Sequence, residues 1–83
     1  MLFVTKNLNE KEVFDMKATI RLRAGGDPLI VNDITVIKEV TTDETRDIEY
    51  FTRFAIFDYM YIFIGSDIVS VRGEDILSVR FSD

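Results

Sequence analysis

The sequence contains no cysteine, no histidine and no tryptophan, and it has a single proline. Without cysteine the chain forms no disulfide bond, and without cysteine and histidine it offers no ordinary structural zinc site. Histidine is the commonest general base and cysteine is an intrinsically strong nucleophile, so their absence argues against catalysis. We therefore expect no enzyme, no cofactor and no metal site.

Long apolar runs are absent as well. The longest one, Tyr59 to Ile64, is far shorter than the roughly 20 residues that a membrane-spanning helix needs. Residues Met1 to Lys6 have neither a basic leader nor a small-residue cleavage site, so we expect no export signal. These observations predict a cytoplasmic protein with no membrane partner.

The 83 residues are 47% hydrophobic and 12% aromatic, which predicts a folded chain. This length supports one hydrophobic core, so we expect a single domain over residues 1–83. So small a core is marginal and needs close packing or association with identical copies. The formal net charge of −5 argues against a uniformly basic nucleic-acid binder, although local basic patches are compatible with it.

Turn-forming residues divide the chain, and the strongest signal is Ala24 to Pro28, where two glycines precede Asp-Pro. Between the turns, apolar and polar residues alternate as in half-buried β-strands. The pattern predicts strands over Met16–Ala24, Asp47–Ile56, Ile68–Arg72 and Ile76–Ser82, the last two joined as a hairpin by a tight turn at Gly73.

Three other segments depart from simple alternation. Between Leu29 and Val40 the apolar phase changes, which predicts a bulge or strong bend, as when one strand serves both layers of a small barrel. Asn7 to Phe14 is either a short helix capped by Asn7 or a hairpin. Tyr59 to Ile64 is apolar on both faces, which places it either at the centre of the fold or in a subunit interface, and we favour the interface.

Residues Ile68 to Val79 resemble the second sequence motif of the Sm and Sm-like family. In that motif an apolar strand is followed by Arg-Gly, an acidic or polar residue, Asn, Ile and a further apolar strand. Arg72, Gly73, Glu74 and Ile76 match it, and Asp75 stands where the family usually has Asn. The resemblance implies a mainly β fold, a strongly bent five-stranded antiparallel barrel of the SH3-like or Sm-like type. It also implies a homo-oligomeric ring of about five to seven subunits.

The family's first motif fits this chain in two registers. In one, residues Thr41 to Arg46 form the ligand loop; in the other, Phe57 to Tyr61 resembles the motif's Phe-Asp and Met-Asn positions. Neither register supplies the expected Asn. We prefer the first register, because it leaves no predicted strand unassigned and uses the strongest turn signal.

In rings of this family the fourth strand of one subunit pairs with the fifth strand of the next. The last predicted strand here has no proline and little charge, so it is poorly protected as a free edge. We expect it to pair with the apolar Tyr59 to Ile64 region of a neighbour. The predicted interface residues are Tyr59, Tyr61, Phe63, Ile76, Ser78 and Arg80.

Family rings bind single-stranded RNA at loops around the central hole, where the Arg-Gly turn lies. The guanidinium of Arg72 could stack on a base and meet phosphate, and Gly73 would let the backbone approach a base edge. The alternative is an ordinary turn in which Gly73 adopts a positive φ and Arg72 is solvated. The predicted sites for single-stranded RNA or DNA are Arg72, Gly73, Asp75, Thr42, Asp43 and Arg46.

Two functions follow from these predictions. The first is an Sm-like ring that binds single-stranded nucleic acid, with a role in RNA or DNA processing, and the alternative is a scaffolding ring without nucleic-acid binding. The charge of the candidate rim distinguishes them. Convergence of arginines favours the first function, and a majority of carboxylates favours the second; the residues concerned are Arg21, Arg46, Arg72, Asp43, Glu44, Glu74 and Asp75.

Overall fold

Short alternating segments of this sequence form antiparallel β-strands in a computed structural model that describes residues 16–51 and 54–83. Within this described part there is no α-helix, and the segment 7–14 lies outside it. The elements are β1 (Lys17–Leu22), β2 (Leu29–Val31), β3 (Val36–Val40), β4 (Thr45–Ile48), β5 (Met60–Ile64), β6 (Ile68–Arg72), the short 3₁₀ turn η2 (Gly73–Asp75) and β7 (Ile76–Ser82).

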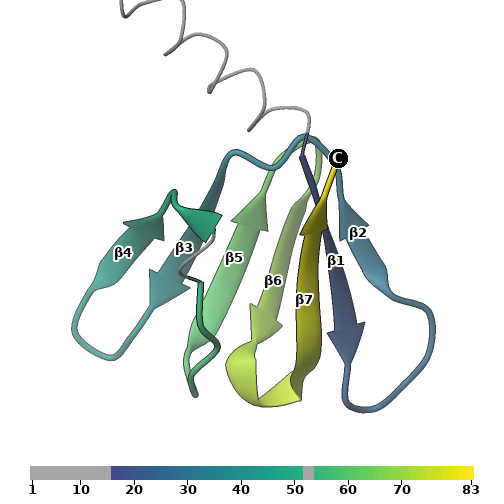
Figure 1. Cartoon of the computed structure of the whole chain (residues 1–83). Coiled ribbons are helices and arrows are strands. Elements are labelled where there is room, and N and C mark those ends of the chain that lie inside the picture. The colour runs from purple at the N-terminus through teal and green to yellow at the C-terminus, as the bar shows by residue number, and fades with distance from the viewer. Residues whose placement is uncertain (1–15, 52–53) are drawn as a thin grey trace, which may run out of the picture.

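The strands form two antiparallel sheets, one of three strands in the order β2-β1-β7 and one of four strands in the order β4-β3-β5-β6 (Figure 1). The prediction of a mainly β fold is therefore confirmed. The prediction of five strands is not, because the described residues form seven strands and no ladder closes the two sheets into a barrel. One additional strand arises because the segment Leu29 to Val40, predicted as one bent strand, forms the two strands β2 and β3.

The bend predicted between Leu29 and Val40 is present. The segment splits into β2, which pairs with β1, and β3, which pairs with β4 and β5. Asp33 lies between them with a φ of 53°, a left-handed conformation that Asp tolerates better than most residues. Val31 and Ile34 on either side of it are both fully buried. The change of apolar phase in the sequence therefore marks the point where the chain passes from one sheet to the other.

The core contains the inward-facing residues of both sheets. Alternation within β1 buries Ala18 and Ile20, and alternation within β5 buries Tyr61 and Phe63. These side chains belong to one hydrophobic cluster, whose other buried members are Val31, Ile34, Ile37, Val71 and Ile76.

The strand predicted over Asp47 to Ile56 is shorter than expected, because regular pairing stops at Ile48. Beyond it, aromatic packing determines where the described residues lie. The Phe54 ring makes edge-to-face contacts with Tyr61 and Phe63 of the larger sheet and with Phe81 of the smaller one. Such a ring gains more from packing on both sheets than from alternating along an edge strand.

The strands Ile68–Arg72 and Ile76–Ser82 form as predicted, but they are not a hairpin. β6 pairs with β5, whereas β7 pairs with β1, so the two strands belong to different sheets. The turn η2 carries the chain between the sheets, with Val71 before it and Ile76 after it both in the core.

The pairing of β5 corrects the predicted subunit interface. β5 is hydrogen-bonded to β3 on one side and to β6 on the other, so it has no free edge for a neighbour's strand. Tyr61, Phe63 and Ile76 are core side chains of their own chain, because their positions face inward between the sheets. Of the predicted interface residues, Tyr59, Ser78 and Arg80 are exposed.

Candidate functional site

A row of polar side chains crosses the inner face of the four-stranded sheet at one end. Arg46 of β4, Glu39 of β3 and Tyr61 of β5 are direct cross-strand neighbours. Glu39 has the same strand parity as the core residue Ile37, and its side chain is therefore directed inward. Only 2% of Glu39 is exposed.

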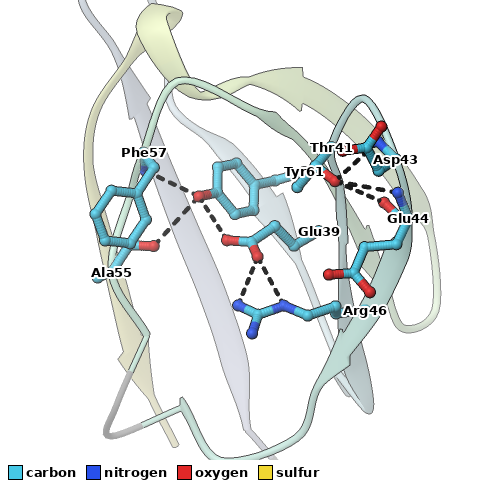
Figure 2. A network of polar contacts seen from close by, with 8 residues as sticks. All are labelled: Glu39, Thr41, Asp43, Glu44, Arg46, Ala55, Phe57 and Tyr61. Atoms are coloured by element: carbon cyan, nitrogen blue, oxygen red, sulfur yellow. Dashed lines mark hydrogen bonds and ion pairs between the residues drawn. The ribbon is translucent and has the colours of Figure 1, made fainter.

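Both oxygens of the buried Glu39 carboxylate accept hydrogen bonds (Figure 2). Arg46 donates to Oε1 from Nε and Nη2, at 3.1 and 2.7 Å, and the Tyr61 hydroxyl donates to Oε2 at 3.0 Å. A buried carboxylate is tolerated when it is paired and hydrogen-bonded in this way. The hydrogen bond from Arg46 to Glu39, and then the charge of that carboxylate, raise the pKa of the Arg46 guanidinium.

Tyr61 connects this row to the segment that precedes β5. Its hydroxyl oxygen accepts a hydrogen bond of 2.8 Å from the backbone N–H of Phe57 and lies 3.4 Å from the carbonyl oxygen of Ala55 (Figure 2). We infer that the Tyr61 hydroxyl donates its proton in a hydrogen bond to Glu39 rather than to Ala55, because the contact with Glu39 is shorter and its acceptor is charged. Burial raises the pKa of Tyr61, the hydrogen bond from the Phe57 N–H opposes this in part, and the hydrogen bond to Glu39 and the charge of that carboxylate raise the pKa further.

Gly73 also contacts the backbone of the segment before β5. Its N–H donates to the carbonyl oxygen of Tyr59 at 2.6 Å, and a Cβ at this glycine would collide with the carbonyl oxygen of Phe57. Gly73 is buried and is not among the described glycines with positive φ, which are Gly25 and Gly26. The absence of a side chain therefore serves packing within the chain, and the alternative of a positive-φ turn at Gly73 is wrong.

These contacts leave two aromatic rings in solvent. Phe57 is 58% and Tyr59 is 42% exposed, and their ring centroids are 6.2 Å apart with a tilt of 48°. Two adjoining hollows lie beside them, the larger of about 480 Å³, and both include Thr41, Thr42 and Tyr59. The larger hollow is also lined by Glu39, Asp43, Glu44, Arg46 and Phe57, and the smaller by Val40, Asp58, Met60 and Arg72. We call these two hollows and their rings the aromatic surface.

Four of the six predicted nucleic-acid-binding residues meet at the aromatic surface. Thr42, Asp43 and Arg46 come from the loop between β3 and β4 and from β4 itself, and Arg72 comes from the end of β6. Gly73 lies beneath this surface. Asp75 lies outside both hollows, and its backbone carbonyl accepts a hydrogen bond from the N–H of Arg23.

Carboxylates outnumber guanidinium groups at the aromatic surface. Four acidic side chains and two arginines line the two hollows, and each arginine is already paired with a carboxylate, Arg46 with Glu39 and Arg72 with Glu74. The three remaining acids form no ion pair with any described residue; they are Asp43, Glu44 and Asp58. The surface is therefore electronegative, and it disfavours phosphate groups.

Glu39 and Phe57 are central to this site. The sequence predicted no role for Glu39, and Phe57 entered only through the register of the first Sm motif that we did not prefer. Glu39 had a recognisable signal, because it is a charged residue at an inward position of a predicted strand. Phe57 had a weaker one, since an aromatic residue before an apolar strand is as compatible with the core as with the surface.

Residues 16–51 and 54–83 contain no group of three acidic side chains placed to hold a metal ion. No helix in this part of the chain has the length and apolar character needed to cross a membrane. The chain matches no protein-family model, no curated protein and no solved structure.

Replacing Gly73 by alanine tests the support beneath the aromatic surface. The new Cβ must displace the backbone at Phe57, so we expect a loss of about 2 kcal/mol in the free energy of unfolding, as for overpacking, measured by urea denaturation. The amide NMR signals of Phe57 and Tyr59 should shift. Gly26→Ala is the comparison, because it strains a φ of 89° without a collision. Unshifted Phe57 and Tyr59 signals in Gly73→Ala would show that Gly73 does not support the backbone of these two residues.

Replacing Tyr61 by phenylalanine tests the hydrogen-bonded row. It removes a partner from Glu39 and from the Phe57 N–H, and leaving such groups unpaired costs about 1–3 kcal/mol at neutral pH. The folded-state pKa of Tyr61 is raised above the ordinary value of 10.0, so the stabilisation is complete below that value and is lost as the pH rises through the folded-state pKa.

The measurement is the free energy of unfolding of wild type and Tyr61→Phe at about pH 8 and about pH 11. The difference between the two proteins should shrink at the higher pH, because only the wild type loses this contribution. A difference that stays constant over this range would show that Tyr61 is not held in its protonated form by the fold.

Proposed function

We propose that this protein is a structural module that assembles with copies of itself through the outer edges of β6 and β7. The observation that carries the proposal is that each of these two strands is paired along one edge only. In the described chain β6 pairs only with β5 and β7 only with β1, so each has one edge without a strand partner. Unpaired backbone N–H and C=O groups along a strand are a template for a further strand.

The edge of β6 has few of the devices that protect a strand from association. It has no proline or lysine, its one charged residue is Arg72 at the end, and its register with β5 is regular over all five residues. The other edges differ, since β2 has only three residues and β4 carries the charged side chains of Arg46 and Asp47. The edge of β7 is irregular at its start, where Leu77 is the extra residue of a bulge opposite β1, and it is regular from Ser78 onward.

Exposed apolar side chains lie on both edge strands. Ile68 at the start of β6 is 69% exposed and Leu77 of β7 is 58% exposed. If β6 of one subunit pairs with β7 of the next, the two contacting surfaces differ and the contact is heterologous. Repeating it with the same rotation from subunit to subunit can close a ring. The resemblance of Ile68 to Val79 to the second Sm motif supports this proposal, because that segment comprises β6, η2 and most of β7. It also supports an Sm-like, barrel-type subunit.

The charge of the aromatic surface supports a scaffolding role over nucleic-acid binding. A majority of carboxylates at the candidate rim favours the ring without nucleic acid. Here four acidic side chains line the two hollows together with two arginines, and both arginines are already paired with carboxylates. Phosphate contacts depend on cations that are available to the backbone of the nucleic acid.

The assembly proposal predicts an oligomer at micromolar concentration, measured by light scattering coupled to size exclusion. Ile68→Lys places a charge on the β6 edge, so we expect it to release monomers that keep the wild-type circular dichroism spectrum. Tyr50→Lys is the matched control, because Tyr50 is 77% exposed and lies on neither edge strand. A wild-type monomer, or equal dissociation in both variants, would refute assembly through this edge.

Single-stranded nucleic-acid binding is the second candidate, favoured by the meeting of Arg46, Arg72 and Tyr59 at one surface. The scaffolding proposal predicts no binding of fluorescent U-rich or A-rich RNA, or of the corresponding DNA, in anisotropy titrations even at low salt. Binding by the wild type that weakens severalfold in Arg72→Ala would replace the scaffolding proposal by this one. Binding that is equal in both proteins would refute both.

A further inference from the structure

The exposed rings of the aromatic surface are held on a fixed backbone. The N–H of Phe57 donates to Tyr61, and the carbonyl oxygen of Tyr59 accepts from Gly73, so hydrogen bonds from β5 and η2 hold both ends of this short segment. An exposed pair of large aromatic side chains gains nothing from core burial. A backbone held in this way favours binding of a ligand, since only the side-chain torsions of the two rings remain to be ordered.

The opposite wall of the larger hollow is also fixed. The Thr41 hydroxyl oxygen accepts hydrogen bonds from the N–H groups of Asp43 and Glu44, and the Thr41 hydroxyl and N–H both donate to the Glu44 carbonyl oxygen (Figure 2). This closed turn presents the carboxylates of Asp43 and Glu44 in the hollow that Phe57 and Tyr59 line. Asp58 adds a third carboxylate in the adjoining hollow.

We propose that the aromatic surface binds an arginine side chain in an exposed segment of a partner protein. A guanidinium is attracted to the faces of aromatic rings, and its planar donors pair with carboxylates, so both walls select the same group. Charge complementarity favours this ligand over a phosphate. Arg46 and Arg72 do not oppose it strongly, because each is neutralised by its own partner, Glu39 or Glu74.

This site shares only Arg72, the last residue of β6, with the strand edges proposed for assembly. It is built from the β3–β4 loop, β4, the segment before β5 and the last residue of β6. The outer edges of β6 and β7 that carry Ile68 and Leu77 are not part of it. An assembled ring would therefore present one such site on every subunit, which makes the two proposals separately testable.

The test titrates ¹⁵N-labelled protein with a blocked pentapeptide of glycine, serine and one central arginine. The same peptide with citrulline in place of arginine is the matched ligand, since citrulline keeps the shape and lacks the charge. We expect the arginine peptide to shift the amide signals of Phe57, Tyr59 and Asp43 and to bind at least about threefold more tightly than the citrulline peptide.

Variants distinguish the contributions of the aromatic and acidic walls to peptide binding from the effect of the net charge of the protein. Phe57→Ala/Tyr59→Ala and Asp43→Asn/Glu44→Gln should each weaken binding at least about threefold, and they keep the backbone contacts that position both segments. The matched controls change the same number of charges or an exposed ring elsewhere. They are Asp27→Asn/Asp67→Asn and Tyr50→Ala, and both should bind like the wild type.

Three results would overturn this proposal. The first is equal weakening by Asp27→Asn/Asp67→Asn, which would show attraction to net charge alone. The second is equal binding of the arginine and citrulline peptides, or no binding of either. The third is the same set of shifts on concentrating the protein without peptide, which would assign the site to a second copy. The oligomeric state measured for Ile68→Lys decides the assembly proposal independently.

Discussion

The buried carboxylate of Glu39 determines the arrangement of one end of this molecule. Removing a charge from water is costly unless hydrogen-bonding partners replace the solvent, and here Arg46 and Tyr61 supply them. This requirement joins β4, β3 and β5 side by side at their inner face. Through the Tyr61 hydroxyl it extends to the backbone of Phe57, so one ionised group also fixes a segment that belongs to no strand. Removing either partner would leave a charge or a polar group without compensation.

The positions of Tyr59 and Phe57 follow from that constraint together with the packing of η2. Gly73 can lie against the Phe57–Tyr59 backbone only because it has no side chain, and the resulting contacts leave the two rings outside the core. Tyr61, two residues further along, faces inward and is buried. A single short segment thus supplies both an inner polar anchor and an outer aromatic pair. Regular alternation would put Tyr59 and Tyr61 on the same side, but the chain bends at Asp58 and Tyr59 before β5 begins, so alternation does not extend across that point.

Two different kinds of surface remain available to partners. The edges of β6 and β7 offer backbone hydrogen-bonding groups, which any compatible strand can pair with, and they suit a second copy of the chain. The aromatic surface offers rings and carboxylates, which select by charge and shape. Assembly and recognition would therefore use largely different residues, with Arg72 of β6 common to both strand edge and aromatic surface, and the contacts between subunits would compensate for the small size of the chain.

Local pattern in the sequence determined most of the strands, the positive-φ turn at Gly25 and Gly26, and the change of sheet near Asp33, because alternation and turn chemistry act over a few residues. Tertiary structure decided which strands pair, and so placed β6 and β7 in different sheets and Tyr61 and Phe63 in the core. It also brought Thr42, Asp43, Arg46 and Arg72 together and balanced their charges with Glu39 and Glu74. Alternation of apolar and polar residues indicates that a strand has an apolar face, but only the packing of distant segments determines which neighbour covers that face.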